Sequence, residues 1–137
     1  MHDNHVQAVG EERFKTWFPT KTLMAQGIPV ALATDAPVAD YYPLPHIETA
    51  ITRVNPVDGS PGSLAPEEAI SLEEAIKAYT ITPAYILGWE NKIGSIEEGK
   101  YADMVILDNN LFEIEPSEIS EVKIFKTIFE GEVVYDR

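Results

Sequence analysis

An uninterrupted apolar run occupies residues 28–33 (Ile-Pro-Val-Ala-Leu-Ala) and ends two positions before Asp35. Because no polar residue alternates with the apolar ones, the pattern predicts a strand covered on both faces, which is typical of parallel sheets. Asp35 then has two interpretations. A carboxylate just past the C-terminal end of a barrel strand lies on the catalytic rim of such enzymes. An aspartate shortly before a proline, here Pro37, also commonly shapes a turn.

Helical patterns flank this run on both sides. Residues 11–26 have helical character, and Pro19 can start a second helix within them that Gly27 ends. Downstream, an apolar stripe with spacing i, i+3, i+4 and i+7 predicts an amphipathic helix; it consists of Ile47, Ala50, Ile51 and Val54. Arg53, near the end of this helix, has two open roles: it can interact with the helix C-terminus, or it can reach an anionic group of a substrate.

The next segments carry clear start and stop signals. Residues 55–66 are rich in Pro, Gly, Ser and Asn and predict a loop. Ser71 followed by Glu74 forms the pattern of a capping box for a helix over residues 71–79. A short helix follows, with Thr82 as its expected N-cap and Gly88 at its end.

Beyond residue 88 the pattern changes from helical to β. A strand is predicted at 102–107, a short helix at 115–120, and a hairpin that pairs 122–129 with 132–135 around Glu130-Gly131. The chain therefore belongs to the α/β class, and the change of character predicts two parts, residues 1–88 and 89–137.

Charge and composition limit the classes of partner that the chain is expected to bind. The 137 residues include 10 Lys and Arg against 23 Asp and Glu, which gives a net charge of −13. Such a surface repels nucleic acid and anionic membranes, so neither is an expected partner. The chain has no cysteine, which excludes thiolate metal sites. It also has no apolar run of membrane-spanning length and no signal-peptide pattern, so a cytoplasmic protein is expected.

Two sets of motifs resemble a known family. Thr82-Pro83-Ala84, followed by residues 94–108 (Gly-Ser-Ile-Glu-Glu-Gly-Lys-Tyr-Ala-Asp-Met-Val-Ile-Leu-Asp), resembles the C-terminal signature of the metal-dependent amidohydrolase superfamily. Residues 33–37 (Ala-Thr-Asp-Ala-Pro), 51–53 (Ile-Thr-Arg) and 72–80 (Leu-Glu-Glu-Ala-Ile-Lys-Ala-Tyr-Thr) are similar to its branch called amidohydrolase family 3. The similarity extends from about residue 10 to residue 135.

The resemblance implies a fold and an activity. The fold is a (β/α)8 TIM-type barrel followed by a small β-sandwich, with residues 28–33 as the eighth barrel strand and residues 94–108 in the sandwich. The activity is hydrolysis of C–N bonds in non-peptide or cyclic amides by metal-activated water. Asp35 matches the family's metal ligand and catalytic base, Arg53 is a candidate substrate contact, and the expected cofactor is a divalent metal, zinc. Gly99 and Asp103 then have structural roles, in a turn and in local pairing.

The chain is too short for that whole fold. A (β/α)8 barrel needs about 250 residues, and a zinc site needs about three protein ligands. The family's histidine ligands have no match here, because His2 and His5 have the wrong spacing and position. The sequence therefore predicts a C-terminal fragment that is inactive alone and requires the N-terminal part of the enzyme or another copy of itself. The alternative is a non-catalytic remnant that acts as a self-associating binding or assembly module.

Overall fold

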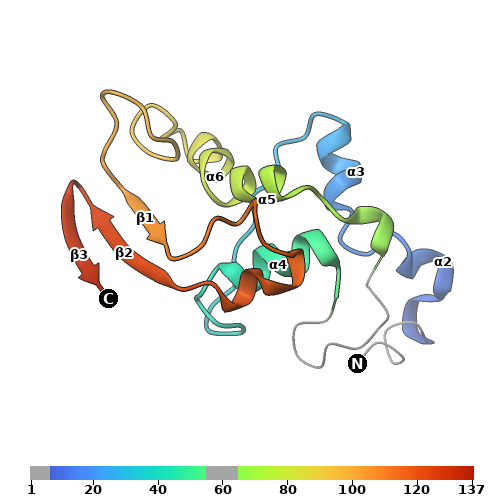
Figure 1. Cartoon of the computed structure of the whole chain (residues 1–137). Coiled ribbons are helices and arrows are strands. Elements are labelled where there is room, and N and C mark those ends of the chain that lie inside the picture. The colour runs from blue at the N-terminus through green and yellow to red at the C-terminus, as the bar shows by residue number, and fades with distance from the viewer. Residues whose placement is uncertain (1–6, 55–64) are drawn as a thin grey trace.

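Helices occupy one end and the middle of the molecule, and a small sheet forms the other end (Figure 1). The structure is a computed structural model that describes residues 7–54 and 65–137. The elements in chain order are α2 (Glu11–Phe14), α3 (Thr20–Ala25), α4 (Leu44–Thr52), η1 (Pro66–Glu68), α5 (Leu72–Tyr79), α6 (Ile81–Ile86), β1 (Met104–Leu107), η2 (Pro116–Glu121), β2 (Ile124–Phe129) and β3 (Glu132–Asp136). This mixture confirms the α/β class. The predicted loop at 55–66 lies almost entirely outside the described residues.

The sheet has the order β1-β2-β3 and both pairs are antiparallel. The hairpin between β2 and β3 turns at Glu130 and Gly131, whose φ angles of 50° and 86° are both positive. This is the backbone form that matches the right-handed twist of the two strands, so the predicted hairpin is confirmed. Asp103 also has the predicted pairing role, because its Oδ1 accepts a 2.7 Å hydrogen bond from the Glu130 amide.

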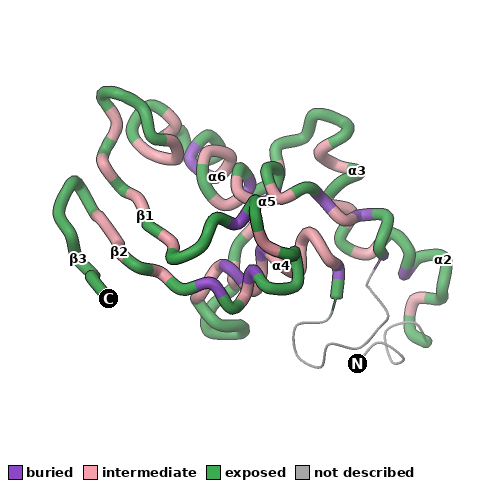
Figure 2. The backbone as a smooth tube through the Cα atoms, in the orientation of Figure 1, coloured by how far each residue is buried: buried purple, intermediate pink, exposed green. Residues whose placement is uncertain are grey.

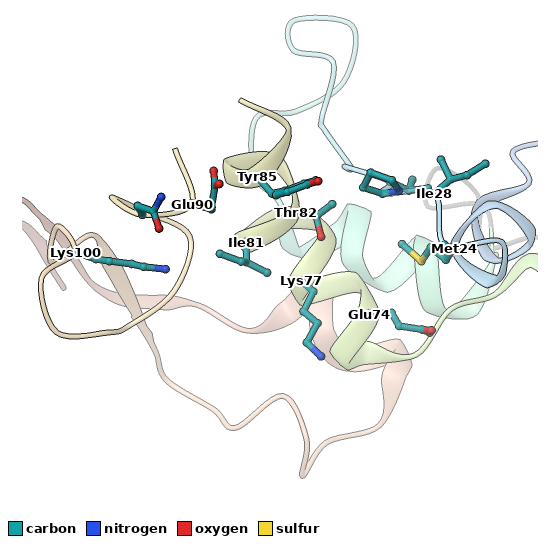
Figure 3. A pocket seen from close by; sticks show the side chains of 13 residues that line it. Met24, Ile28, Glu74, Lys77, Ile81, Thr82, Tyr85, Glu90 and Lys100 are labelled. Carbon is teal, nitrogen blue, oxygen red and sulfur yellow. The ribbon is translucent and has the colours of Figure 1, made fainter. Parts of the chain in front are cut away.

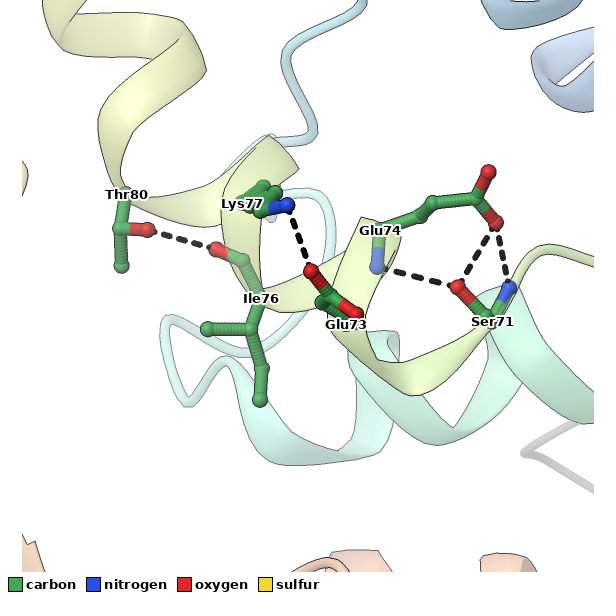
Figure 4. Close-up of polar contacts among 6 residues, drawn as sticks. All are labelled: Ser71, Glu73, Glu74, Ile76, Lys77 and Thr80. Atoms are coloured by element: carbon green, nitrogen blue, oxygen red, sulfur yellow. Dashed lines mark hydrogen bonds and ion pairs between the residues drawn. The ribbon is translucent and has the colours of Figure 1, made fainter.

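The predicted helices form with small shifts of their ends. The capping box of α5 is present: the Glu74 amide donates to Ser71 Oγ, and the Ser71 amide donates to the Glu74 carboxylate (Figure 4). The helix α6 begins at Ile81, so the N-cap is Thr80 and not the predicted Thr82. Thr80 is both the C-cap of α5 and the N-cap of α6, and its hydroxyl donates a 2.8 Å hydrogen bond to the Ile76 carbonyl. The segment 115–120 forms the 3-10 helix η2.

The core lies where α4, α5 and η2 meet, near the middle of the molecule (Figure 2). Its buried members are Leu44, Ile47, Ile70, Ala75, Leu111, Ile119 and Val122. Two hydrogen bonds tie α4 and η2 together: Tyr42 Oη, just before α4, donates to the carbonyl of Val122, just after η2, at 2.6 Å, and the Ser120 amide of η2 donates to the Glu48 carboxylate of α4 at 2.8 Å. The core thus uses residues from both sides of position 88, and the division into two parts stays a prediction.

Residues 28–33 do not form the strand that their apolar pattern predicts. They are extended, and they pair with none of the three strands that the described residues contain. Their backbone is held to the helical body by the Leu32 amide, which donates to the Ala78 carbonyl at 2.9 Å. Ile28 is 43% exposed. The prediction of a strand covered on both faces is therefore wrong for this structure, because a strand needs a neighbouring strand for its backbone groups.

Candidate functional site

Asp35 lies at the end of the extended segment and begins a turn. Its φ is 56°, in the left-handed region that aspartate tolerates better than most residues. The Val38 amide donates to the Asp35 carbonyl at 2.8 Å, and the Asp35 side chain is exposed to solvent. The turn-forming interpretation is thus visible in the backbone. The catalytic and metal-binding roles of Asp35 stay predictions.

A metal site does not assemble from the described residues alone. Within residues 7–54 and 65–137, no three His, Cys, Asp or Glu side chains lie close enough together to hold one ion. His46, the one histidine in these ranges, has its Nε2 3.1 Å from the Asp40 carbonyl oxygen. His2 and His5 lie outside the described residues. The donors present here therefore do not fit a zinc site that needs about three protein ligands.

Arg53 is buried and points into the protein. It is the C-cap residue of α4, has a φ of 56°, and is 8% exposed. Its Nη2 donates a 2.9 Å hydrogen bond to the Trp17 carbonyl, in the link between α2 and α3. Burial lowers the pKa of Arg53, and the negative charge of Glu68 opposes that shift. The predicted substrate contact of Arg53 stays a prediction.

Glu68 is a buried charged residue that no pattern in the sequence indicates. It is 6% exposed, and its carboxylate accepts hydrogen bonds from the Thr22 hydroxyl and, at 2.9 Å, from the Thr22 amide. These two bonds are the main reason that the pKa of Glu68 is lowered, and the charge of Arg53 adds to them. Within the sequence Glu68 is one of two consecutive glutamates after a proline, a pattern that ordinarily marks an exposed turn.

An open groove of about 730 Å³ lies between the start of the extended segment, the helices α5 and α6, and the loop over residues 90–100 (Figure 3). Both apolar and charged side chains line it: Met24, Ile28, Val30, Ile81 and Tyr85, then Glu74, Lys77, Glu90 and Lys100. The Glu90 Oε2 atom is buried without a hydrogen-bond partner among the described residues. Asp35 and Arg53 do not line this groove.

No helix within the described parts of the chain is both long enough and apolar enough to cross a membrane.

Known proteins resemble this chain over nearly its whole length. Residues 2–135 match the model of the amidohydrolase family. The putative amidohydrolase YtcJ of Bacillus subtilis (strain 168) is 35% identical over 132 residues, which cover 96% of this chain and 25% of that protein. The N-substituted formamide deformylase of Arthrobacter pascens is 35% identical over 120 residues, which cover 88% of this chain and 22% of that protein.

The chain thus spans about a quarter of the length of these curated relatives. Among solved structures, the 5-methylcytosine deaminase of Klebsiella pneumoniae liganded with phosphonocytosine matches with a TM-score of 0.59 and 19% identity, over 91% of this chain and 30% of that one. At this identity the likeness concerns the fold alone. The match to the family model covers the motifs at 33–37, 51–53, 72–80 and 94–108 in one alignment, and the chain therefore belongs to the amidohydrolase family, in the branch numbered 3.

Proposed function

We propose that this chain is the C-terminal segment of a metal-dependent amidohydrolase that hydrolyses C–N bonds in non-peptide or cyclic amides. The observation that carries the proposal is the family match over residues 2–135, combined with relatives about four times as long. One of these relatives has the name N-substituted formamide deformylase, which supports an amide substrate. The segment proposed is the end of a (β/α)8 barrel followed by part of a β-sandwich.

Asp35 has the central chemical role in this proposal. A divalent metal, with zinc the expected one, would lower the pKa of a bound water towards neutrality. Asp35 would contribute one carboxylate to that site, and the same carboxylate would accept a proton from the attacking water and return it to the leaving nitrogen. The exposure of Asp35, at the end of the segment that follows residues 28–33, supports this role, since its carboxylate is open to solvent among the residues that the structure describes.

The proposal also requires that the isolated chain is inactive. The described residues contain no cluster of three metal donors, so the remaining ligands come from the preceding part of the enzyme. Residues 28–33 pair with no strand among the described residues, which supports the same partner, because neighbouring barrel strands would supply further backbone hydrogen bonds along the segment. Arg53 stays a candidate substrate contact in the assembled enzyme.

A chimeric enzyme tests the proposal. Residues 1–137 replace the matching segment of the Arthrobacter pascens deformylase, and hydrolysis of an N-substituted formamide is measured together with bound zinc. We expect an active chimera, and a fall in kcat of about 10²–10⁴-fold in Asp35→Asn with loss of zinc, because the base and a ligand are removed together. Asp40→Asn, in the same exposed loop, is the matched control. The proposal fails if the folded chimera is inactive, or if Asp35→Asn behaves as Asp40→Asn does.

A second candidate function is that of a self-associating binding or assembly module. Its support is apolar surface on the small sheet, where five large side chains are each at least 43% exposed: Val105, Phe125, Phe129, Val133 and Val134. Exposed apolar side chains on a small sheet favour association. Sedimentation equilibrium at micromolar concentration tests it, and a monomer over the whole concentration range would contradict it.

A further inference from the structure

We infer that Glu68 and Arg53 are positioning residues that together anchor the helix α3 and, through it, the segment leading to Asp35. The inference rests on the proposed function only for what Asp35 does, because the anchoring itself is a property of this chain. Both residues carry buried charge, at 6% and 8% exposure, and neither lies on the groove described above.

Glu68 supplies the cap that α3 lacks in its own sequence. The N-cap position is Pro19, which makes no side-chain cap hydrogen bond, and the first turn contains no acidic residue. The first amide groups of a helix have no intrahelical acceptor and carry partial positive charge. Glu68, 46 positions away, accepts hydrogen bonds from the amide and the hydroxyl of Thr22. It thus gives a first-turn amide of α3 an acceptor and places a full negative charge beside the N-terminus of the helix.

Arg53 holds the chain just before that helix. Its guanidinium donates to the Trp17 carbonyl at 2.9 Å, and Trp17 packs edge-on against Phe14 with ring centres 5.3 Å apart. The Arg53 charge also favours the ionised form of Glu68. Two oppositely charged groups therefore hold positions 17 and 22, at the two sides of the entry into α3. A buried charge that loses its partner is costly, so this arrangement resists displacement.

Residues 28–35 follow α3 closely, so the position of α3 determines where this extended segment begins. Gly27 ends the helix region with a φ of 76°, and the Ile28 amide donates back to the Leu23 carbonyl at 3.1 Å. The next described backbone anchor is the bond from the Leu32 amide to the Ala78 carbonyl. The course of residues 28–35 is thus held at its start by α3 and at its middle by α5, and Asp35 lies three residues beyond the second anchor.

Hydrogen–deuterium exchange on the full chain tests the anchor. The variants are Glu68→Leu, which removes both acceptors, Glu68→Gln, which keeps an acceptor oxygen without the charge, and Arg53→Met. Glu67→Gln, at the exposed neighbouring glutamate, is the matched control. We expect Glu68→Leu and Arg53→Met to speed exchange over residues 20–35 by roughly five- to tenfold, as loss of a cap or a charged hydrogen bond does. Exchange in β2 stays unchanged, and Glu68→Gln restores part of the protection.

Each other outcome overturns the inference. If exchange over residues 20–35 is the same in Glu68→Leu as in Glu67→Gln, Glu68 anchors nothing. If exchange in β2 rises by the same factor, the residue stabilises the whole fold and positions no particular segment. If Glu68→Gln is as unprotected as Glu68→Leu, the hydrogen-bond acceptor is not what holds α3. These results are separate from the chimera assay, in which the proposed function fails through Asp35 while the anchor stays intact.

Discussion

Gly94 is the position at which a single added methyl group has the most clearly defined consequence. The loop after Trp89 turns back at Gly94 and lies against the start of α6. A Cβ at Gly94 would be 2.8 Å from Ala84 Cβ, 2.9 Å from Ile81 Cα and 3.0 Å from the Thr80 carbonyl oxygen. The first two atoms belong to or are fixed directly on the backbone of α6, so no flexible side chain can move aside. Gly94→Ala must therefore shift the loop or the helix.

The expected loss of stability in Gly94→Ala has two contributions, and comparison with Gly99→Ala separates them. Gly94 has a φ of +94° and Gly99 has a φ of +92°, but an added Cβ at Gly99 meets no atom within 4 Å. Both alanine variants carry the cost of a positive φ, about 1–2 kcal/mol. Gly94→Ala alone adds the cost of overpacking against a helix, about 1–3 kcal/mol. We expect Gly94→Ala to lower the free energy of unfolding by about 2–5 kcal/mol, and Gly99→Ala by about 1–2 kcal/mol.

Urea unfolding followed by far-UV circular dichroism measures both variants beside the parent chain, with the slope of the transition checked for two-state behaviour. The difference between the two variants is the quantity of interest, since it cancels the shared backbone term. Equal losses in Gly94→Ala and Gly99→Ala would refute the reasoning, because they would mean that the close packing of the loop on α6 contributes nothing.

Three further predictions concern caps, turns and pH. Ser71→Ala removes the hydroxyl of the capping box and is expected to cost about 1 kcal/mol in urea unfolding, whereas the exposed Ser117→Ala is expected to cost far less. Glu130→Asn places a residue that tolerates φ > 0 at a hairpin position with φ 50°, and we expect a gain of about 0.5–1 kcal/mol by the same assay; a loss would contradict the turn assignment. The pKa values of Glu68 and Glu74 are lowered in the folded chain by hydrogen bonds from Thr22 and Ser71, so the stability they confer is complete above the ordinary glutamate pKa and is lost as the pH falls through their folded values. Unfolding midpoints measured from neutral to acid pH should fall less steeply in Glu68→Gln and Glu74→Gln than in the parent.

Local signals in the sequence predicted local structure well. The capping box of α5 and the Glu130-Gly131 hairpin both depend on residues no more than a few positions apart, and the structure has both. Glu68 could not be found in this way, because its partners Thr22 and Arg53 are 46 and 15 positions away and no periodic pattern links them. The buried role of Arg53 was missed for the same reason: the sequence shows where the residue lies on its helix, but not that Trp17 lies opposite.

The strand predicted at residues 28–33 differs from these cases. Its apolar pattern is that of a buried strand, but the described residues around it include no neighbouring strand with which it could pair. A segment of six apolar residues has the composition of a strand buried on both faces, yet Ile28 is 43% exposed and the described residues offer it no neighbouring strand. The residues of this segment would gain both their backbone hydrogen bonds and the burial of their side chains from strands on either side. A local sequence that suits a buried environment, set in a structure that leaves it open, supports the proposal that further polypeptide completes this part of the fold. Asp35 lies at the end of this segment, and its proposed chemistry depends on the same completion.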